Sequence, residues 1–333
     1  MRRIVVVTQV VDASHPALGA TVPKLRALAE RVDELAVLAL RGTADGLPGN
    51  CRLRLFGAGT KLGRAARFEA ALAPELRRRP ERLLAHMAPI YAVLAAPPAR
   101  ALGVRTLLWF THWRSTPTLR LAEKLVDRVV SVDRRSFPLD SAKVTPIGHG
   151  IDLSEFPCAD HGAGSGLRVL ALGRTSPAKG LDTVIRAVAQ VERARLEIRG
   201  PSLTDEERRH REQLERLARE LGAPVELGGP VPRADVPRLL ARADLLVNNM
   251  RAGAPDKVVY EAAATCLPVL ASNPVLDDLI DPFPREDAGE LARRLRAFAA
   301  FGAQERAVIG RSLREQVAAR HSVDSWADGV LSA

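Results

Sequence analysis

Two short segments of the sequence carry charged side chains in a spacing that could bind a diphosphate. In the first, Leu170–Asp182, a buried apolar strand is expected to end at Gly173 and a helix to begin near Gly180. The loop between them carries Arg174 and Lys179. Ligands of open α/β sheets lie at the carboxyl ends of the strands, and helix N-termini attract anions. Two cations at such a place predict a phosphate-binding loop.

Taken alone, this loop also fits an ordinary surface loop with solvated cations. It is not a P-loop, because Lys179 precedes Gly180, whereas a P-loop has Gly followed by Lys and then Ser or Thr. The sequence also contains no Asp-x-Asp motif that would hold a metal-clamped diphosphate. Any diphosphate bound here would therefore be neutralised by side chains.

The second segment, Asp256–Ser272, reads as a loop, a helix beginning near Lys257, and a strand. Lys257 and Glu261 are four residues apart and therefore share a helix face. A surface ion pair is the plainest interpretation. The alternative is that this helix, which lies between two apolar strands, directs its first turn toward the same crevice as the Arg174 loop.

Hydrophobic periodicity predicts alternating strands and helices that position these loops. The predicted strands are Ile4–Thr8, Glu34–Leu40, Cys51–Phe56, Val104–Phe110, Arg128–Val132, Leu167–Leu172, Arg195–Ile198, Val225–Leu227, Asp244–Asn248 and Pro268–Ala271. The predicted helices include Thr21–Arg31, Arg77–Leu94, Gly180–Val191, Thr204–Leu221, Val236–Ala241, Ala288–Ala300 and Gln304–Ala319. Such alternation indicates βαβ units and parallel sheets, and hence two doubly wound α/β domains.

The best domain boundary lies at about residues 148–166, where the chain is rich in glycine. The glycine spacing does not fit a dinucleotide-binding fingerprint, and the segment precedes a strand instead of following one, so we interpret it as a linker. This places one domain at 1–150 and the other at 151–319, and the tail from about 320 to 333 is expected to pack back on the first domain.

Composition and cysteine usage exclude several classes of protein. Of the 333 residues, 47% are hydrophobic and 26% charged, which is typical of a globular chain and not of a disordered one. The sequence holds no run of 18 apolar residues, and its beginning reads as a first strand. Three scattered cysteines predict neither a disulfide framework nor a metal knuckle, and favour a reducing cytosol; these are Cys51, Cys158 and Cys266.

The positive charge is concentrated in the first half of the chain. Residues 1–150 hold 24 Lys and Arg against 12 Asp and Glu. This excess of positive charge predicts an anionic partner. The alternative explanation is the base composition of the genome, because arginine is enriched throughout the chain. In Lys61–Arg82, cations alternate with Leu62, Phe68, Leu72 and Leu76, a pattern that could lie on an anionic membrane surface. Alternatively, the arginines of this segment are simply solvated at the surface, or they bind a soluble anionic acceptor.

Several of these segments follow one another in a known order: Val144–Phe156, then Gly173-Arg174 with Lys179-Gly180, then Glu261 with Pro268-Val269. In this order the chain resembles the retaining nucleotide-sugar glycosyltransferases of the GT-B fold, specifically family 4. Cys266 stands where that family usually has Gly. The resemblance implies two Rossmann-like domains that face a central cleft. It is weaker in the first domain than in the second.

The resemblance implies that Arg174 and Lys179 neutralise the donor diphosphate and that Glu261 accepts hydrogen bonds from the ribose hydroxyls. The family usually has a second carboxylate eight residues before this Glu, where Gly253 stands here. Some relatives carry a Lys four residues before the Glu, as this chain does. The donor-binding residues implied in this way are Gly173, Arg174, Lys179, Gly200, Val231, Lys257, Val258 and Glu261.

In the first domain, an apolar strand is followed by His112. The residues alone favour a structural His112, but relatives often have a histidine here that contacts the donor sugar. His86 on a predicted helix, His210 and His321 are weaker candidates. The loop Pro16–Ala20 resembles the family's small-residue loop, in which the backbone of Gly19 and Ala20 would approach the phosphate and the acceptor.

The resemblance therefore implies a metal-independent hexosyltransferase without a cofactor. Its substrate is a nucleotide-sugar donor, and its acceptor is unidentified, either lipid-linked or anionic. His112, Arg174 and Lys179 would carry catalysis. We expect the protein in the cytoplasm, or attached to the inner face of the membrane by residues 61–82. Nucleic acid is not expected as a partner, because only 4% of residues are aromatic. The alternatives are a GT-B epimerase, a non-catalytic basic binding protein, and a degenerate transferase that binds without turnover.

Overall fold

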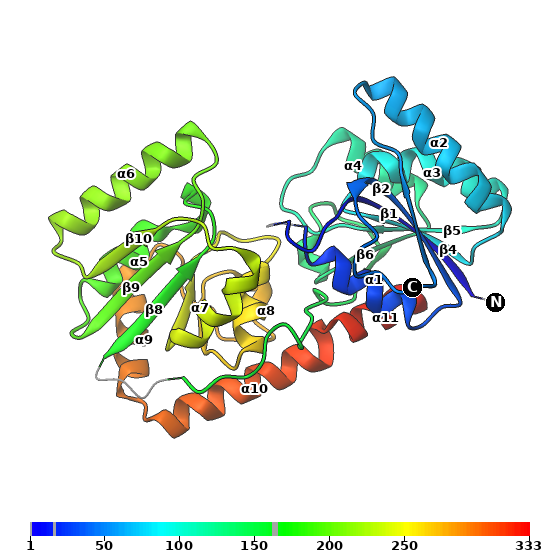
Figure 1. The fold of residues 1–333 in the computed structure, drawn as a ribbon. Helices are drawn as coiled ribbons and strands as arrows, with labels where there is room; N and C mark the ends of the chain where they lie inside the picture. The colour runs from blue at the N-terminus through cyan, green and yellow to red at the C-terminus, as the bar shows by residue number, and fades with distance from the viewer. Residues whose placement is uncertain (1, 16–17, 162–165) are drawn as a thin grey trace. The chain divides into compact units, whose positions relative to one another are not determined.

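The computed structural model describes residues 2–15, 18–161 and 166–333. Contacts divide the chain into two units, one of Met1–Asp152 with Arg320–Ala333 and the other of Leu153–Ala319. Each unit is an α/β fold built on its own parallel sheet (Figure 1). The C-terminal segment therefore belongs to the unit in which the chain begins.

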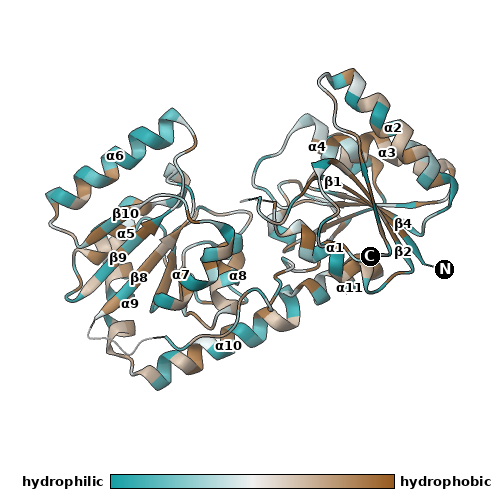
Figure 2. Ribbon diagram, viewed as in Figure 1, coloured by the Kyte–Doolittle hydropathy of each residue, from teal (hydrophilic) through white to brown (hydrophobic). Residues whose placement is uncertain are grey.

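The first unit has a seven-stranded sheet in the order β3-β2-β1-β4-β5-β6-β7. Its strands are almost continuously apolar where helices cover both faces, as parallel sheets require (Figure 2). The strands are β1 (Arg3–Val11), β2 (Glu34–Gly42), β3 (Cys51–Leu55), β4 (Arg82–His86), β5 (Arg105–Trp109), β6 (Arg128–Ser131) and β7 (Val144–Pro146). The helices are α1 (Thr21–Ala29), α2 (Lys61–Arg77), α3 (Pro89–Ala101), α4 (Pro117–Leu125), η1 (Arg134–Ser136) and α11 (Val323–Ser332).

The second unit has a five-stranded parallel sheet in the order β10-β9-β8-β11-β12. The apolar residues of its first helix recur at helical spacing, so that Leu181, Val184, Ile185 and Val188 all enter the core. The strands are β8 (Leu167–Leu172), β9 (Ala194–Arg199), β10 (Val225–Gly228), β11 (Leu245–Asn248) and β12 (Val269–Ala271). The helices are η2 (Pro177–Lys179), α5 (Leu181–Val188), α6 (Asp205–Glu220), η3 (Arg233–Asp235), α7 (Val236–Arg242), α8 (Lys257–Ala264), η4 (Pro274–Leu276), α9 (Ala288–Ala300) and α10 (Ala303–His321).

The prediction of two doubly wound α/β domains is confirmed, but the predicted helix over 77–94 is wrong. Strand β4 runs through its middle, and His86 ends that strand instead of lying on a helix. Because β4 is central and buried on both faces, its apolar run lacks the alternation that marks a half-buried strand. Arg79 and Met87 take positive φ values of 48° and 53° on either side of it. Strand β7 and helix α4 were also not predicted.

Each sheet has one place where the strand order reverses. In the second sheet the reversal lies between β8 and β11, the two neighbours at its centre. The connections that leave these two strands go to opposite sides, so their carboxyl ends bound the crevice where open α/β sheets bind ligands. The Arg174 loop follows β8, and the segment that leads to α8 follows β11.

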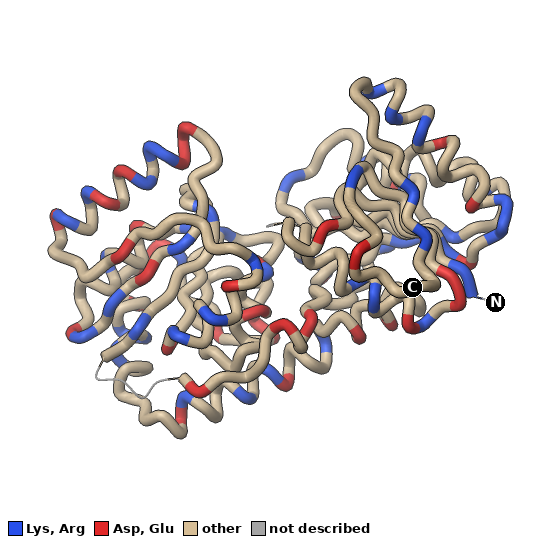
Figure 3. Tube along the Cα trace, viewed as in Figure 1, with Lys and Arg blue, Asp and Glu red and all other residues tan. Residues whose placement is uncertain are grey.

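The basic segment Lys61–Arg82 differs from the predicted amphipathic surface. Phe68, Leu72 and Leu76 on α2 are at most 2% exposed and pack in the core of the first unit. They are therefore not available to a membrane, and among the interleaved apolar residues only Leu62 remains exposed, at 86%. Figure 3 shows the cations along α2. Contact of these cations with an anionic surface stays a prediction.

None of the helices in the described ranges is both long and apolar enough to span a bilayer.

Helix α11 is fixed to the first unit by buried aromatic contacts and by an ion pair at the surface. Trp326 is 1% exposed and meets the Trp109 ring edge-on at 5.7 Å between centroids. The buried Lys24 ammonium lies 4.7 Å from the centre of the Trp109 ring and 5.1 Å from that of Trp326. Arg31 pairs with Asp328 at 2.6 Å. A cation between two indole rings retains favourable electrostatics although it is out of water.

Cys158 and Cys266 form a disulfide, with their Cα atoms 5.0 Å apart. The prediction that the cysteines build no disulfide is therefore wrong, and it fails because 108 residues separate the two in sequence. The fold brings them together where the linker crosses the end of α8, since Ala159 N donates to Thr265 O at 3.0 Å. The inference of a reducing compartment, which rested on cysteine usage, loses its basis.

We expect protein that is purified without reductant and unfolded in guanidinium chloride to present one thiol to Ellman's reagent, and three after reduction. The single thiol belongs to Cys51, and burial raises the pKa of that thiol to about 11 in the folded protein. Cys51→Ser should then present none before reduction. Three thiols in the unreduced wild type would contradict the pairing.

Candidate functional site

Two glycines at the carboxyl ends of β8 and β9 allow close approach of the backbone. Gly173 and Gly200 have φ values of 144° and 152°, which side chains rarely permit. A Cβ atom at Gly200 would lie 1.8 Å from Gly173 O, and one at Gly173 would lie 2.8 Å from Lys179 Nζ. The lysine therefore lies directly against the end of β8, where a larger residue would displace it.

Lys179 ties the loop after β8 to the loop after β11. Its ammonium pairs with the carboxylate of Asp256, and its side chain is only 14% exposed. Asn248, at the end of β11, donates its Nδ2 to Asp256 Oδ2 at 2.7 Å. Asn249 donates to Gly180 O at 2.8 Å. The contacts cross the reversal of strand order between β8 and β11, so they form at the expected ligand crevice.

Arg174 points toward α6. Its Nη2 lies 2.6 Å from Glu207 Oε1, and the Arg174 side chain is half exposed while that of Glu207 is 4% exposed. Glu207 Oε2 accepts a further hydrogen bond from Leu203 N at 2.6 Å. Both cations of the predicted phosphate loop are thus held by carboxylates, and an anionic ligand would have to draw them away from these partners.

Glu261 is almost buried and receives two cations on one oxygen. Lys257 Nζ lies 2.6 Å from Glu261 Oε1 and Arg233 Nη1 lies 3.2 Å from the same atom. The prediction that Lys257 and Glu261 share a helix face is confirmed. Arg233 also pairs with Glu155 Oε2 at 2.5 Å. With a side chain only 7% exposed, Glu261 is not part of a surface ion pair.

Glu261 Oε2 accepts no hydrogen bond from the described residues, and Oε1 is the nearer oxygen in both ion pairs. A carboxylate oxygen can accept more than one hydrogen bond, so this oxygen is able to receive a hydroxyl donor. Its neighbour Oε1 is fixed by the two cations, which set the orientation of the carboxylate. The geometry therefore suits recognition of a ligand hydroxyl by a preoriented acceptor.

Sequence reasoning missed Arg233: the resemblance implied a role for the nearby Val231, but no local pattern distinguished Arg233 itself. It also did not assign a role to Glu155, which belongs to the linker, or to Asp256. The partner of each lies far along the chain. Only the fold brings η3, the linker and α8 together.

The remaining predicted donor residues take different positions. Val231 is half buried between β10 and η3, whereas Val258 is 8% exposed within α8. Gly253 has φ 116°, and its carbonyl accepts a hydrogen bond from Asn273 Nδ2 at 3.1 Å. Gly253 thus has a backbone role where the resembled family has a carboxylate.

His112, Gly19 and Ala20 belong to the first unit, whereas the contacts described above are all within the second. His112 Nδ1 accepts a hydrogen bond from Arg114 N at 2.9 Å, which leaves the proton of the neutral ring on Nε2. Burial, and then the charge of Arg114, lowers the pKa of His112. The neutral ring can therefore donate from Nε2.

The loop before α1 is only partly described, since residues 16 and 17 of the predicted small-residue loop lie outside the described ranges. Gly19 N donates to His15 O at 2.8 Å, and Ala20 immediately precedes α1. The Gly19 N–H is therefore already used within its own loop.

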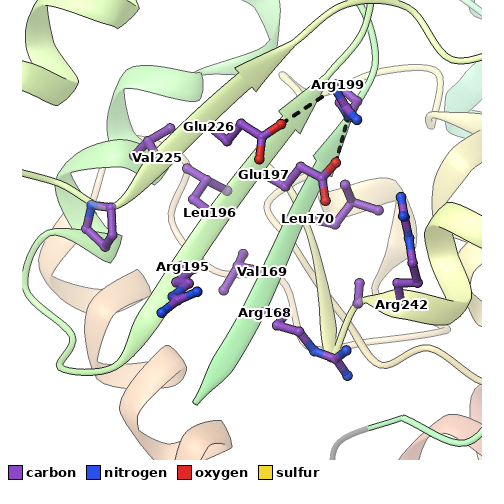
Figure 4. A pocket seen from close by; sticks show the side chains of 12 residues that line it. Arg168, Val169, Leu170, Arg195, Leu196, Glu197, Arg199, Val225, Glu226 and Arg242 are labelled. Atoms are coloured by element: carbon purple, nitrogen blue, oxygen red, sulfur yellow. Dashed lines mark ion pairs between the residues drawn. The ribbon is translucent and has the colours of Figure 1, made fainter. Parts of the chain in front are cut away.

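A hollow of about 760 Å³ lies over one face of β8, β9 and β10 (Figure 4). Its lining is charged, and several of its cations are paired: Arg168 with Asp244 at 2.6 Å, and Arg199 with Glu197 at 2.7 Å. It contains none of the residues predicted to bind the donor. Among the described residues, no three His, Cys, Asp or Glu side chains lie close enough together to hold a metal ion.

Comparison with known proteins supports one architecture. Residues 166–300 match the family model described as Glycosyl transferases group 1. Anabaena HepE, solved with UDP-glucose, is 20% identical and has a TM-score of 0.73, with both chains covered completely (100% of each). Sucrose-phosphate synthase from Thermosynechococcus elongatus is 18% identical with a TM-score of 0.76, over 100% of this chain and 98% of that one. This chain has the two-domain GT-B fold.

A glycosyltransferase from Rickettsia africae gives the same result, with 12% identity and a TM-score of 0.77 over 99% of this chain and 97% of that one. No curated protein sequence matches the chain. The GT-B architecture expected from the sequence is confirmed, and the group 1 match in the second unit supports a GT-B glycosyltransferase. Membership of family 4 stays a prediction.

We expect Arg233→Ala to destabilise the second unit, because it removes a cation from the nearly buried Glu261. A loss of about 2 kcal/mol would lower Tm by roughly 4–8 °C for a unit of this size. The measurement is scanning calorimetry. The matched control is Arg238→Ala, since Arg238 is 86% exposed and lies 3.7 Å from its partner Asp235; it should change Tm little. Equal shifts in the two variants would contradict the role given to Arg233.

Proposed function

We propose that this protein transfers a hexose from a nucleoside-diphosphate donor to a hydroxyl acceptor with retention of the anomeric configuration. The observation that carries the proposal is the arrangement at the carboxyl ends of β8 and β11. There Lys179 lies against Gly173, and Glu261 presents an oxygen that accepts no hydrogen bond from the described residues. A cation beside a strand end suits the diphosphate, and a fixed carboxylate suits the ribose hydroxyls.

Uracil is our first candidate for the base of the donor nucleotide, because the similar structure of Anabaena HepE was solved with UDP-glucose. In the proposed complex, the diphosphate draws Lys179 from Asp256 and Arg174 from Glu207. Each exchange replaces one anionic partner by another, so neither cation becomes unpaired in the process.

During transfer, the bond between the sugar C1 and the β-phosphate oxygen breaks as the bond from C1 to the acceptor oxygen forms. Both occur on the same face of the sugar, and the departing phosphate oxygen takes the proton of the acceptor hydroxyl. Negative charge grows on the diphosphate in this step. Lys179 and Arg174 stabilise that charge, and because the fold holds them in place, little reorganisation is needed.

His112 contributes by donating from Nε2 to the donor sugar, and no resident metal or cofactor takes part in this proposal. The Glu261 carboxylate binds the nucleoside as a hydrogen-bond acceptor and does not react.

Lys179→Ala should weaken binding of nucleoside diphosphates by roughly 10- to 100-fold, the usual effect of losing a charge-assisted hydrogen bond. Isothermal titration with UDP, GDP, ADP and dTDP measures it and identifies the base at the same time. Lys61→Ala, which removes an exposed lysine from the first unit, serves as the control and should bind like the wild type. The proposal fails if Lys179→Ala retains full affinity for the diphosphate that the wild type binds.

A further inference from the structure

Two oxygens beside Lys179 have no donor directed at them. Within the described chain, Asp256 accepts hydrogen bonds from Lys179 Nζ and Asn248 Nδ2 through Oδ2, whereas its Oδ1 accepts none and the side chain is 21% exposed. Asn248 Oδ1 is buried without a hydrogen bond, in a residue that is 4% exposed. The amide orientation is fixed, because turning it over would set an oxygen against the Asp256 carboxylate.

An unsatisfied buried acceptor such as Asn248 Oδ1 is costly, and the partly exposed carboxylate of Asp256, which Asn248 contacts, has a second oxygen that can accept; the place therefore suits a ligand that donates hydrogen bonds. Phosphate oxygens are acceptors and carry negative charge, so Asp256 Oδ1 would repel them. Hydroxyl groups are the donors that a sugar nucleotide carries on either side of its diphosphate. The two oxygens are therefore suited to hydroxyls next to the phosphates and not to the phosphates themselves.

A nucleotide sugar has two sets of hydroxyls, one on the ribose and one on the transferred sugar. The ribose set is assigned to Glu261 under the proposed function, on which this step depends. Asp256 lies instead against Lys179, the cation assigned to the diphosphate. In residues 249–257 it is the one carboxylate, because position 253 is glycine. The set that remains is that of the transferred sugar.

We propose that Asp256, together with Asn248, determines donor-sugar specificity by accepting hydrogen bonds from hydroxyls of the transferred sugar. In the ligand-free protein the same Asp256 carboxylate holds Lys179. Binding of a nucleotide sugar gives each group a new partner: Lys179 takes the phosphates and Asp256 takes the sugar.

This double role gives Asp256 an effect that a merely structural residue would not have. Without its carboxylate, Lys179 is freed for phosphate, so binding of the nucleoside diphosphate alone should stay equal or become tighter. Binding of the nucleotide sugar loses its sugar contact. The two affinities should therefore move apart, and their ratio is the quantity to measure.

The experiment compares Kd for a nucleoside diphosphate with Kd for its sugar conjugates by isothermal titration. The ligands are UDP, UDP-glucose, UDP-galactose and UDP-N-acetylglucosamine, together with GDP, GDP-mannose, ADP, ADP-glucose, dTDP and dTDP-glucose. For Asp256→Ala, we expect affinity for the preferred nucleotide sugar to fall about tenfold relative to the diphosphate alone. Asp256→Asn, which keeps one acceptor oxygen and the side-chain size, should fall less. Asp182→Ala removes an exposed carboxylate from the first turn of α5 and should leave the ratio unchanged.

An unchanged ratio in both folded Asp256 variants would overturn the assignment, whether the two affinities stay constant or fall together. That result leaves the proposed function intact, because the wild type would still bind its donor. Wild-type protein that binds none of the four diphosphates would overturn the proposed function itself, and this assignment with it.

Discussion

The carboxyl edge of the second sheet depends on cations that are held by carboxylates before any ligand arrives. Lys179 and Arg233 have side chains only 14% and 13% exposed, and each lies against a carboxylate. A charge so far out of water is tolerated only when it is paired. The loops after β8 and β10, the linker and the beginning of α8 each supply a member of such a pair. The ion pairs thus fix the loops, and the loops fix the site.

The same pairing determines what the site can bind. A neutral apolar ligand would leave the pairs as they are, and a cation would meet like charge. A diphosphate can replace the carboxylates of Asp256 and Glu207 as the partner of the two cations, which releases the partly exposed Asp256 carboxylate to accept hydroxyl donors. Charges that are already in position also favour a transition state in which the diphosphate becomes more negative. Under the proposed function, binding and catalysis therefore depend on the same ion pairs.

Much of the fold could be predicted from the sequence, because the residue patterns that determine most strands and helices lie within short segments of the chain. Period-two and period-3.6 patterns give most strands and helices, and the spacing of Lys257 and Glu261 gives their common helix face. Strand β4 could not be found this way, because a strand buried on both faces has no alternation. The local geometry of the candidate site was predictable, as in the loop that follows β8 at Gly173, whereas contacts between residues far apart in the sequence were not. Neither the contact of Arg233 with Glu261 nor that of Lys179 with Asp256 has a local signal, and the same holds for the disulfide of Cys158 and Cys266.

A crystal structure of the wild-type protein soaked with the nucleotide sugar that it binds most tightly tests the central claim most directly. We expect diphosphate oxygens within hydrogen-bond distance of Lys179 Nζ, with the Asp256 carboxylate withdrawn from that ammonium and Glu261 Oε2 accepting from the ribose. Phosphates bound elsewhere, for example in the hollow over β8, β9 and β10, with the ion pair of Lys179 and Asp256 intact, would contradict the account.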